Sequence, residues 1–230
     1  MFSASYPQKM QLLSEKISND AVRVDFEEEE ETVKSITQRV IEVNRENRGP
    51  LLRELLNKNS WSRTLVFMAN KRATDNIAEK FRKYGFQAAS FNGDLEQDLR
   101  NKTLQAFKDK KITVLFATDI AARGLDIDDI DLVINYDLPR SPADYIHRVG
   151  RTARAGKSGL AISFIDYDSM EHFKLIEKRS GISLEREQLK GYELIGEAPK
   201  KQKGPAPVKG KKKSKKDKLR EAKALESSKT

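Results

Sequence analysis

Short apolar segments alternate with longer amphipathic ones along most of the 230-residue chain. The apolar runs contain four to eight residues and lie at 36–43, 64–68, 88–91, 113–117, 132–135 and 160–165. Stretches with a helical spacing of apolar residues lie between them, at 50–57, from 69 to 81, at 96–108 and at 142–154. Strands and helices of these lengths predict an α/β fold, with a parallel β-sheet covered by helices on both faces.

The composition excludes several classes of protein. The chain contains no cysteine, so a disulfide framework and a thiolate zinc site are both excluded, and we expect no metal site. It has no run of about 18 apolar residues, which a transmembrane helix needs. Residues 1–30 lack the charged start, apolar middle and cleavage site of a signal peptide. We therefore expect a cytoplasmic protein without a membrane partner.

The net charge of +9 is confined to the end of the chain. Residues 197–230 contain 13 Lys and Arg and four Asp and Glu, so residues 1–196 have no net charge. The terminal segment is also rich in Pro and Gly and nearly free of large apolar side chains, a composition that does not fold by itself. We predict a folded domain over 35–191 and a disordered Lys-rich tail over 192–230.

A first cluster of polar residues follows the predicted strand 113–117, at the end where open parallel sheets bind ligands. It includes Thr118, Gly124 and Asp126. Glycine allows the backbone to approach a ligand closely, and a carboxylate can accept hydrogen bonds from ribose hydroxyls. An ordinary strand-to-helix turn contains the same residue types, so this cluster alone leaves both interpretations open.

A second cluster contains Arg148, Arg151 and Arg154, which recur at every third position. In a helical turn these side chains would project from neighbouring positions. A solvated basic face is the usual explanation, but Gly150 and Gly156 are poor helix residues that such a face does not need. The planar guanidinium binds phosphate oxygens through two hydrogen bonds and keeps its charge. The cluster therefore predicts contact with a phosphoryl group.

These two clusters resemble motifs of the DEAD-box ATP-dependent RNA helicases. The segment 117–127, with the sequence ATDIAARGLDI, is similar to motif V of that family. The segment 147–154, HRVGRTAR, is similar to motif VI, with Ala153 where the family more often has glycine.

Three further segments resemble motifs of the same family. Residues 93–100 are similar to its motif with Gln and Arg three positions apart, and residues 2–5 to motif III. Residues 64–70 are similar to motif IV, with Asn70 where threonine is common. The five motifs stand in the family's order, and the resemblance covers about residues 1–190.

The resemblance implies a RecA-like fold and a role as the second of two RecA-like domains in an RNA helicase. Such an enzyme couples ATP binding and hydrolysis to local unwinding of RNA duplexes. Residues 1–34 would then be the end of the first RecA-like domain and the interdomain linker. The chain contains neither a phosphate-binding loop nor an Asp-Glu-Ala-Asp stretch, so we expect it not to hydrolyse ATP alone. ATP with Mg²⁺ would bind mainly through the first domain.

The resemblance also implies roles for individual residues at the nucleotide. Arg151 and Arg154 would reach the γ-phosphate as arginine fingers. Gly124 and Asp126 would meet the ribose side of ATP, and His147 would help to couple the two domains.

The implied partners are RNA and the first RecA-like domain of the same protein, which is expected to be a monomer. The implied RNA-binding residues are Gly93, Arg100, Thr118 and Asn70. Contacts with phosphates and sugars position the strand without reading its bases, so little sequence preference is expected.

Two other functions stay open at the level of sequence. One is a related superfamily 2 helicase that acts on DNA. The other is a nucleic-acid-binding module without catalytic activity, which the missing phosphate-binding loop favours and the arginines of the second cluster oppose.

Overall fold

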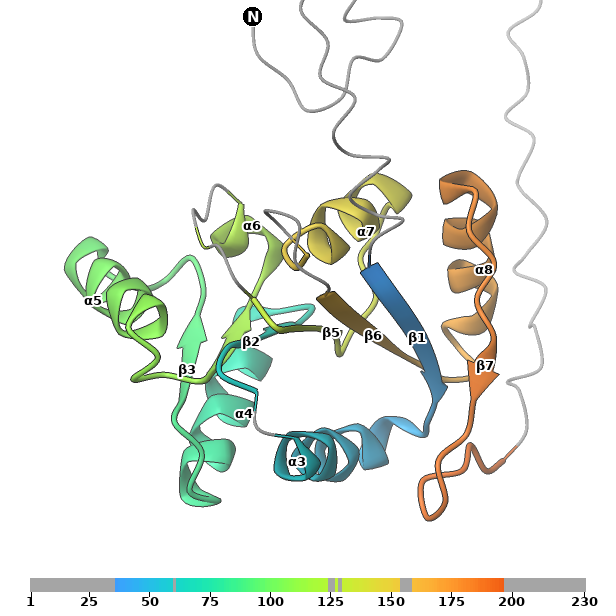
Figure 1. Cartoon of the computed structure of the whole chain (residues 1–230), viewed down its shortest axis with the longest axis horizontal. Helices are drawn as coiled ribbons and strands as arrows, with labels where there is room; N and C mark the ends of the chain where they lie inside the picture. The colour runs from blue at the N-terminus through green and yellow to red at the C-terminus, as the bar shows by residue number, and fades with distance from the viewer. Residues whose placement is uncertain (1–35, 60, 124–126, 128–129, 154–158, 197–230) are drawn as a thin grey trace, which may run out of the picture. The chain divides into compact units, whose positions relative to one another are not determined.

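The computed structural model describes residues 36–59, 61–123, 127, 130–153 and 159–196 (Figure 1). The segment predicted to end a first domain, 1–34, lies outside these residues, as does the predicted tail from residue 197 onward. Within the described ranges, every helix falls short of the length and apolar character that a membrane span requires.

Seven parallel strands of the described region form one sheet in the order β3-β4-β2-β5-β6-β1-β7. The strands are β1 (Ile36–Glu42), β2 (Thr64–Phe67), β3 (Ala88–Phe91), β4 (Val114–Ala117), β5 (Leu132–Asn135), β6 (Gly159–Ile165) and β7 (Arg186–Glu187). The helices are η1 (Arg45–Asn47), α3 (Arg48–Lys58), α4 (Lys71–Lys83), α5 (Gln97–Lys108), α6 (Asp119–Ala122), α7 (Pro142–Val149) and α8 (Met170–Ser180). The predicted parallel α/β fold is confirmed.

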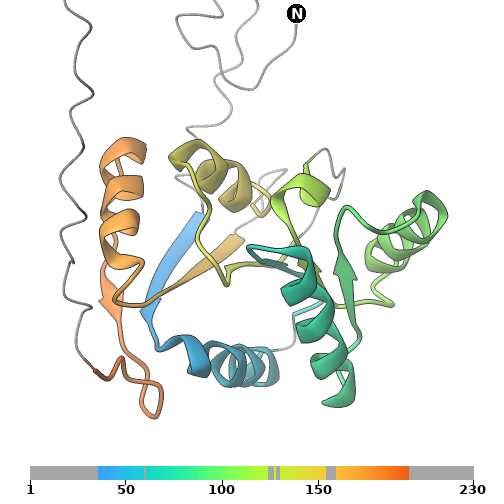
Figure 2. The same ribbon diagram turned by 180° about the vertical axis from the view of Figure 1, so that it is seen from behind.

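Helices cover both faces of the sheet (Figures 1 and 2). Successive strand residues point to opposite faces, so Leu65 and Phe67 of β2 join one buried cluster and Val66 joins the other. The first cluster packs under α5 to α8, and the second under α3 and α4. The central strands β2, β4 and β5 are therefore buried on both sides, which is why they appear in the sequence as continuous apolar runs.

Helix α3 buries one face completely. Leu51, Leu52, Leu55 and Leu56 are all buried in the second cluster. Their spacing of one, three and four residues is the one that predicted a helix at 50–57. Burial of each leucine side chain contributes about 1.5–3 kcal/mol of transfer free energy.

Helix α7 is shorter than predicted. It begins after Ser141, whose hydroxyl accepts a hydrogen bond from the Asp144 amide, and it has Pro142 in its first turn. It ends at Val149, with Gly150 as its C-cap, although the apolar spacing predicted a helix to 154. The second arginine cluster is thus divided between a helix and the turn that follows it.

The folded region also extends beyond the predicted boundary at 191. Leu194 is buried, and the Asn44 side chain makes two 2.8 Å hydrogen bonds with the backbone of Ile195, one donated and one accepted. The Tyr167 hydroxyl donates to the Leu194 carbonyl. These contacts hold residues 192–196 against the ends of β1 and β6, so the predicted start of the tail at 192 is wrong for these five residues.

The ion pair between Glu177 and Arg186 predicts an effect of pH on stability. Two Arg186 nitrogens donate to the two Glu177 oxygens at 3.0 and 2.5 Å. Burial by itself would raise the pKa of Glu177, but the hydrogen bonds from Arg186 and the Leu184 amide lower it below 4.5. A carboxyl group with a lowered pKa stabilises the fold above its unfolded pKa, and this stability is lost as the pH falls through the folded pKa.

We predict that Glu177→Gln makes the free energy of unfolding less dependent on pH below about 4.5. Urea unfolding of the 230-residue chain at several pH values measures this dependence. Glu185→Gln, which changes an exposed carboxylate beside the pair, is the control and keeps the wild-type slope. Equal slopes for Glu177→Gln and the wild type would contradict the prediction.

Candidate functional site

The polar residues predicted to bind ligands lie at one edge of the sheet. All strands are parallel, so their carboxyl ends meet at that edge, where doubly wound folds bind ligands. Gly93, Thr118 and Asn70 follow β3, β4 and β2, which are consecutive strands in the sheet. Asp137 follows β5, the next strand. Residues from distant parts of the chain are therefore brought into one row.

A pocket opens beside this row, between β2, α6 and α7. It is lined by Phe67, Asp119, Ala122, Arg123, Asp144, His147, Arg148 and Arg151. The two segments that the sequence singled out, one after β4 and one around α7, thus line the same pocket. His147 and Arg151, both singled out in the sequence, are among the residues that line it.

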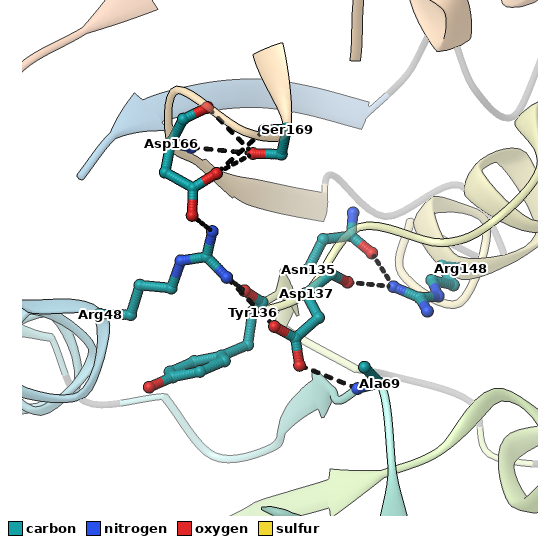
Figure 3. Close-up of polar contacts among 8 residues, drawn as sticks. All are labelled: Arg48, Ala69, Asn135, Tyr136, Asp137, Arg148, Asp166 and Ser169. Atoms are coloured by element: carbon teal, nitrogen blue, oxygen red, sulfur yellow. Dashed lines mark hydrogen bonds and ion pairs between the residues drawn. The ribbon is translucent and has the colours of Figure 1, made fainter. Parts of the chain in front are cut away.

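Arg148 is buried beneath the pocket, with 3% of its side chain exposed. Its Nε and Nη2 donate to the two carboxylate oxygens of Asp119 at 2.6 and 2.8 Å. Its Nη1 donates to the Asn135 side chain at 3.0 Å and to the Asp137 carbonyl at 2.7 Å (Figure 3). The guanidinium also lies 4.7 Å from the centre of the Phe67 ring. A buried guanidinium requires a counter-charge and hydrogen-bond acceptors of this kind to offset its loss of hydration.

The expectation that Arg148, Arg151 and Arg154 project together from a helical turn is therefore wrong for Arg148. Its guanidinium points into the domain because Asp119 and Asn135 offer it paired oxygens there. Arg151 lies beyond the end of α7 and lines the pocket. Arg154, like Gly124 and Asp126, lies outside the described residues.

A second Arg–Asp pair lies at the rim of the pocket. Arg123 Nη2 is 3.0 Å from an oxygen of Asp144, and the Ser141 hydroxyl donates to the other oxygen at 2.7 Å. Burial by itself would raise the pKa of Asp144, but the hydrogen bonds from Ser141 and Arg123 lower it. Unlike Arg148, the Arg123 side chain is 69% exposed, so water competes for this pair.

The turn after α7 is held tightly against the start of β6. Thr152 forms an isolated parallel bridge with Ile130, and its hydroxyl donates to the Ile130 carbonyl. A Cβ atom at Gly159 would lie 2.3 Å from the Thr152 hydroxyl and 2.6 Å from the Ala153 nitrogen, so only glycine fits. Ala153 has a φ of 58°, in the region that glycine occupies without steric cost. The conformation explains why glycine suits position 153.

The residues predicted to bind RNA are placed as follows. Asn70 is the N-cap of α4, and its carboxamide oxygen accepts from the Ala73 amide at 2.9 Å. Gly93 follows β3, and its Cα hydrogens face the Lys71 side chain. Thr118 is the N-cap of α6.

Arg100 has a structural contact that the sequence did not predict. Its Nη2 donates to the Ala121 carbonyl at 2.7 Å, and its guanidinium lies 4.5 Å from the centre of the Phe91 ring. It therefore joins α5 to α6, and the part of the guanidinium not bound to Ala121 is the part that can meet a phosphate.

A second buried arginine, Arg48, was missed in the sequence. It lies at the start of α3, with 6% of its side chain exposed, and its Nη1 donates to the Tyr136 carbonyl and to Asp137 at 3.0 and 3.1 Å (Figure 3). Its Nη2 donates to Asp166 at 2.7 Å. Asp137 and Asp166 follow directly on strands β5 and β6, so the rule that singled out Thr118 could have found both carboxylates.

Comparisons with known proteins agree with this geometry. Residues 48–156 match the family model of the helicase conserved C-terminal domain. The DEAD-box ATP-dependent RNA helicase CshA of Geobacillus kaustophilus is 37% identical over 186 residues, which are 81% of this chain and 40% of that protein. The chain thus spans about two fifths of the length of such relatives.

Two solved structures have the same fold. The E. coli DEAD-box protein SrmB, bound to regulator of ribonuclease activity A, matches 70% of this chain and 95% of its own, with 30% identity and a TM-score of 0.65. The S. cerevisiae protein Dbp5, bound to RNA and ADP BeF3, matches 81% of this chain and 50% of its own, with 31% identity and a TM-score of 0.72. With the fold, the pocket and these matches in agreement, the chain belongs to the DEAD-box RNA helicase family and contains its carboxyl-terminal RecA-like domain.

Proposed function

We propose that this chain supplies the second half of an ATP-dependent RNA helicase. ATP and one strand of RNA would bind between it and a first RecA-like domain, and hydrolysis would drive local unwinding of a duplex. The observation that carries this proposal is the pocket at the carboxyl edge of the sheet, in which α6, α7 and the turn after α7 meet around the Arg148–Asp119 pair.

The pocket has the chemistry to receive the phosphates of a nucleotide held by another domain. Arg151 offers a guanidinium that keeps its charge and can bind two phosphate oxygens. Its role would be to neutralise the negative charge that develops on the transferred phosphoryl group. His147, one turn earlier on α7, would contact the facing domain when the two close. Arg154 would be the second finger, and Gly124 and Asp126 would meet the ribose.

Mg²⁺ would be held mainly by the first domain and the nucleotide. Mg²⁺ prefers carboxylates and phosphate oxygens. The nearest carboxylates of this pocket, Asp119 and Asp144, are already paired with Arg148 and Arg123. The residues described here thus fit the nucleotide better than its metal ion.

RNA would lie along the row formed by the ends of β3, β4 and β2. Gly93 would allow the RNA backbone to approach closely, and Thr118 would offer a hydroxyl group. Asn70 and Arg100 would donate hydrogen bonds to phosphate oxygens. Groups of this kind bind the backbone of the strand and not its bases, so the affinity would depend little on sequence. The similar Dbp5 structure contains RNA, which supports this part of the proposal.

The first prediction from the proposed function concerns Arg151 in a protein that contains both RecA-like domains, called here the two-domain protein. Arg151→Ala lowers RNA-stimulated ATP hydrolysis by about 10³–10⁵-fold, the usual effect of an arginine finger, because the transferred phosphoryl group loses its counter-charge. The Kd for ATP changes little, since the first domain binds most of the nucleotide. Steady-state hydrolysis with RNA or DNA of the same sequence measures the effect and separates an RNA helicase from a DNA helicase.

Arg179→Ala, which removes an exposed arginine from α8, is the control for this experiment and keeps the wild-type rate. Wild-type turnover of Arg151→Ala would refute the assignment of Arg151 as a finger.

A second prediction separates the neighbouring Arg148 from such a catalytic role. Arg148→Ala lowers the free energy of unfolding of the 230-residue chain by about 1–3 kcal/mol, because the buried Asn135 side chain and the partly buried Asp119 carboxylate lose their partner. Arg123→Ala, which breaks the exposed pair at the same pocket, costs less than about 1 kcal/mol. Urea unfolding measures both, and equal losses would show that burial does not distinguish the two pairs.

A third prediction concerns residues 197–230, which contain all of the excess positive charge. We propose that they bind RNA through its phosphates without sequence preference. Removing them reduces the slope of log affinity against log salt, since fewer counterions are released, by about 0.7 for each lost phosphate contact.

Fluorescence anisotropy of a single-stranded RNA at several salt concentrations measures this slope. A chain of the same length with glutamine in place of the lysines of 197–230 is the control for length, and it behaves like the truncated chain. An unchanged slope would mean that the segment does not bind RNA.

A further inference from the structure

Asp137 lies between the two parts of the site. It follows β5, which is the neighbour of β2 in the sheet. On one side is the row of strand ends that we assign to RNA, whose last member is Asn70 after β2. The pocket that we assign to the nucleotide is lined by Phe67 at the end of β2, by Asp119 after β4 and by Arg148, which binds the Asp137 carbonyl.

Every hydrogen-bonding group of Asp137 has a partner. Its amide donates to the Phe67 carbonyl at 3.2 Å, and its carbonyl accepts from Arg148 Nη1 at 2.7 Å. One carboxylate oxygen accepts from Arg48 at 3.1 Å, and the other accepts from the Ala69 amide at 2.9 Å (Figure 3). A residue held at all four groups has little freedom to move independently of its neighbours.

The partners of Asp137 connect it to both functions. Ala69 immediately precedes Asn70, the N-cap of α4, in the loop between β2 and α4, which we call the Asn70 loop (68–70). The bond from the Ala69 amide to Asp137 therefore fixes the position of this loop relative to the sheet. Arg148 in turn holds Asp119, the first residue of α6, and lines the pocket together with Arg151. A displacement of the Asn70 loop is therefore transmitted through Asp137, whose carboxylate binds Ala69 and whose main-chain carbonyl binds Arg148.

We propose that Asp137 is a positioning residue that couples RNA binding at the Asn70 loop to the nucleotide pocket. The inference rests on the function proposed above. The Asp137 carboxylate holds the Ala69 amide at the distance from Arg148 that the closed, RNA-bound site requires. It acts through Ala69 and Arg148 and touches neither ligand.

A purely structural role for Asp137 makes a different prediction, and Asp166 provides the comparison. Both carboxylates bind Arg48, at 3.1 and 2.7 Å, and their side chains are 20% and 17% exposed. Only Asp137 also binds Ala69. The other oxygen of Asp166 accepts from the amide and hydroxyl of Ser169, at the start of α8 (Figure 3). Asp137→Asn and Asp166→Asn thus each weaken an ion pair of the same buried arginine, Arg48. Only Asp137→Asn also weakens the bond to Ala69 and so disturbs the Asn70 loop.

The test is the RNA dependence of ATP hydrolysis in the two-domain protein. We expect Asp137→Asn to raise the RNA concentration for half-maximal stimulation about tenfold, the effect of losing one hydrogen bond to a charged group. We expect Asp166→Asn to leave it unchanged, while both variants lower the thermal unfolding temperature. The half-saturating RNA concentration does not depend on the fraction of folded enzyme, so a loss of stability alone does not change it.

Ala69→Pro is the second variant, in case Asp137→Asn does not fold. It removes the N–H group that Asp137 binds and fixes φ at position 69 at about −65°, but it leaves both side chains of the Asp137–Arg48 pair unchanged. It should raise the half-saturating RNA concentration in the same way.

Three results would overturn the inference. A shift of the same size in Asp137→Asn and Asp166→Asn would assign the effect to Arg48 and leave the proposed function intact. An unchanged half-saturating RNA concentration in Ala69→Pro would also overturn the inference and leave the proposed function intact. A wild-type protein whose ATP hydrolysis does not respond to RNA would overturn both the inference and the proposed function.

Discussion

The guanidinium of Arg148, on α7, contacts three other segments of the chain, and these four segments come together only in the folded state. It binds Asp119 at the start of α6, Asn135 at the end of β5 and the carbonyl of Asp137, and it lies on the ring of Phe67 in β2. Because an unpaired charge at this depth would cost several kcal/mol, the four segments cannot separate without a large loss of stability. The pocket therefore has a rigid base, and the residues that we propose to meet ligands lie on that base.

The apolar pattern was sufficient to predict strands β1 to β6 and helices α3, α4, α5 and α7, because strands buried on both faces leave continuous apolar runs. It did not predict α6, α8 or the two-residue strand β7. The pattern did not predict features that depend on contacts between residues far apart in the sequence. The spacing of α7 continues to 154, but Gly150 caps the helix, and Arg148 turns inward because Asp119 lies opposite it although 29 positions earlier in the sequence. Arg48 gives no local sign of its role, since its partners follow β5 and β6.

The two arginines hold the same short segment from opposite faces of the sheet. Arg48 belongs to α3, which packs with the second cluster, and Arg148 belongs to α7, which packs with the first. Between them, residues 135–137 are bound at two carbonyls and two side chains. The charges of Arg48 and Arg148 are thus neutralised inside the fold, because each of these buried guanidiniums is matched by a carboxylate. Bulk charge consequently says little about where this domain meets nucleic acid.

The contact between Gly159 and the turn after α7 has a consequence for how such sequences can vary. Position 159 touches neither of the ligands discussed here, yet a single methyl group there would collide with Thr152 and Ala153. The two residues that would have to move directly follow Arg151 in the turn after α7. Natural or laboratory variation should therefore be as restricted at Gly159 as at the residues that we propose to meet ATP, and a survey of tolerated substitutions would mark a backbone contact as if it were part of the active site.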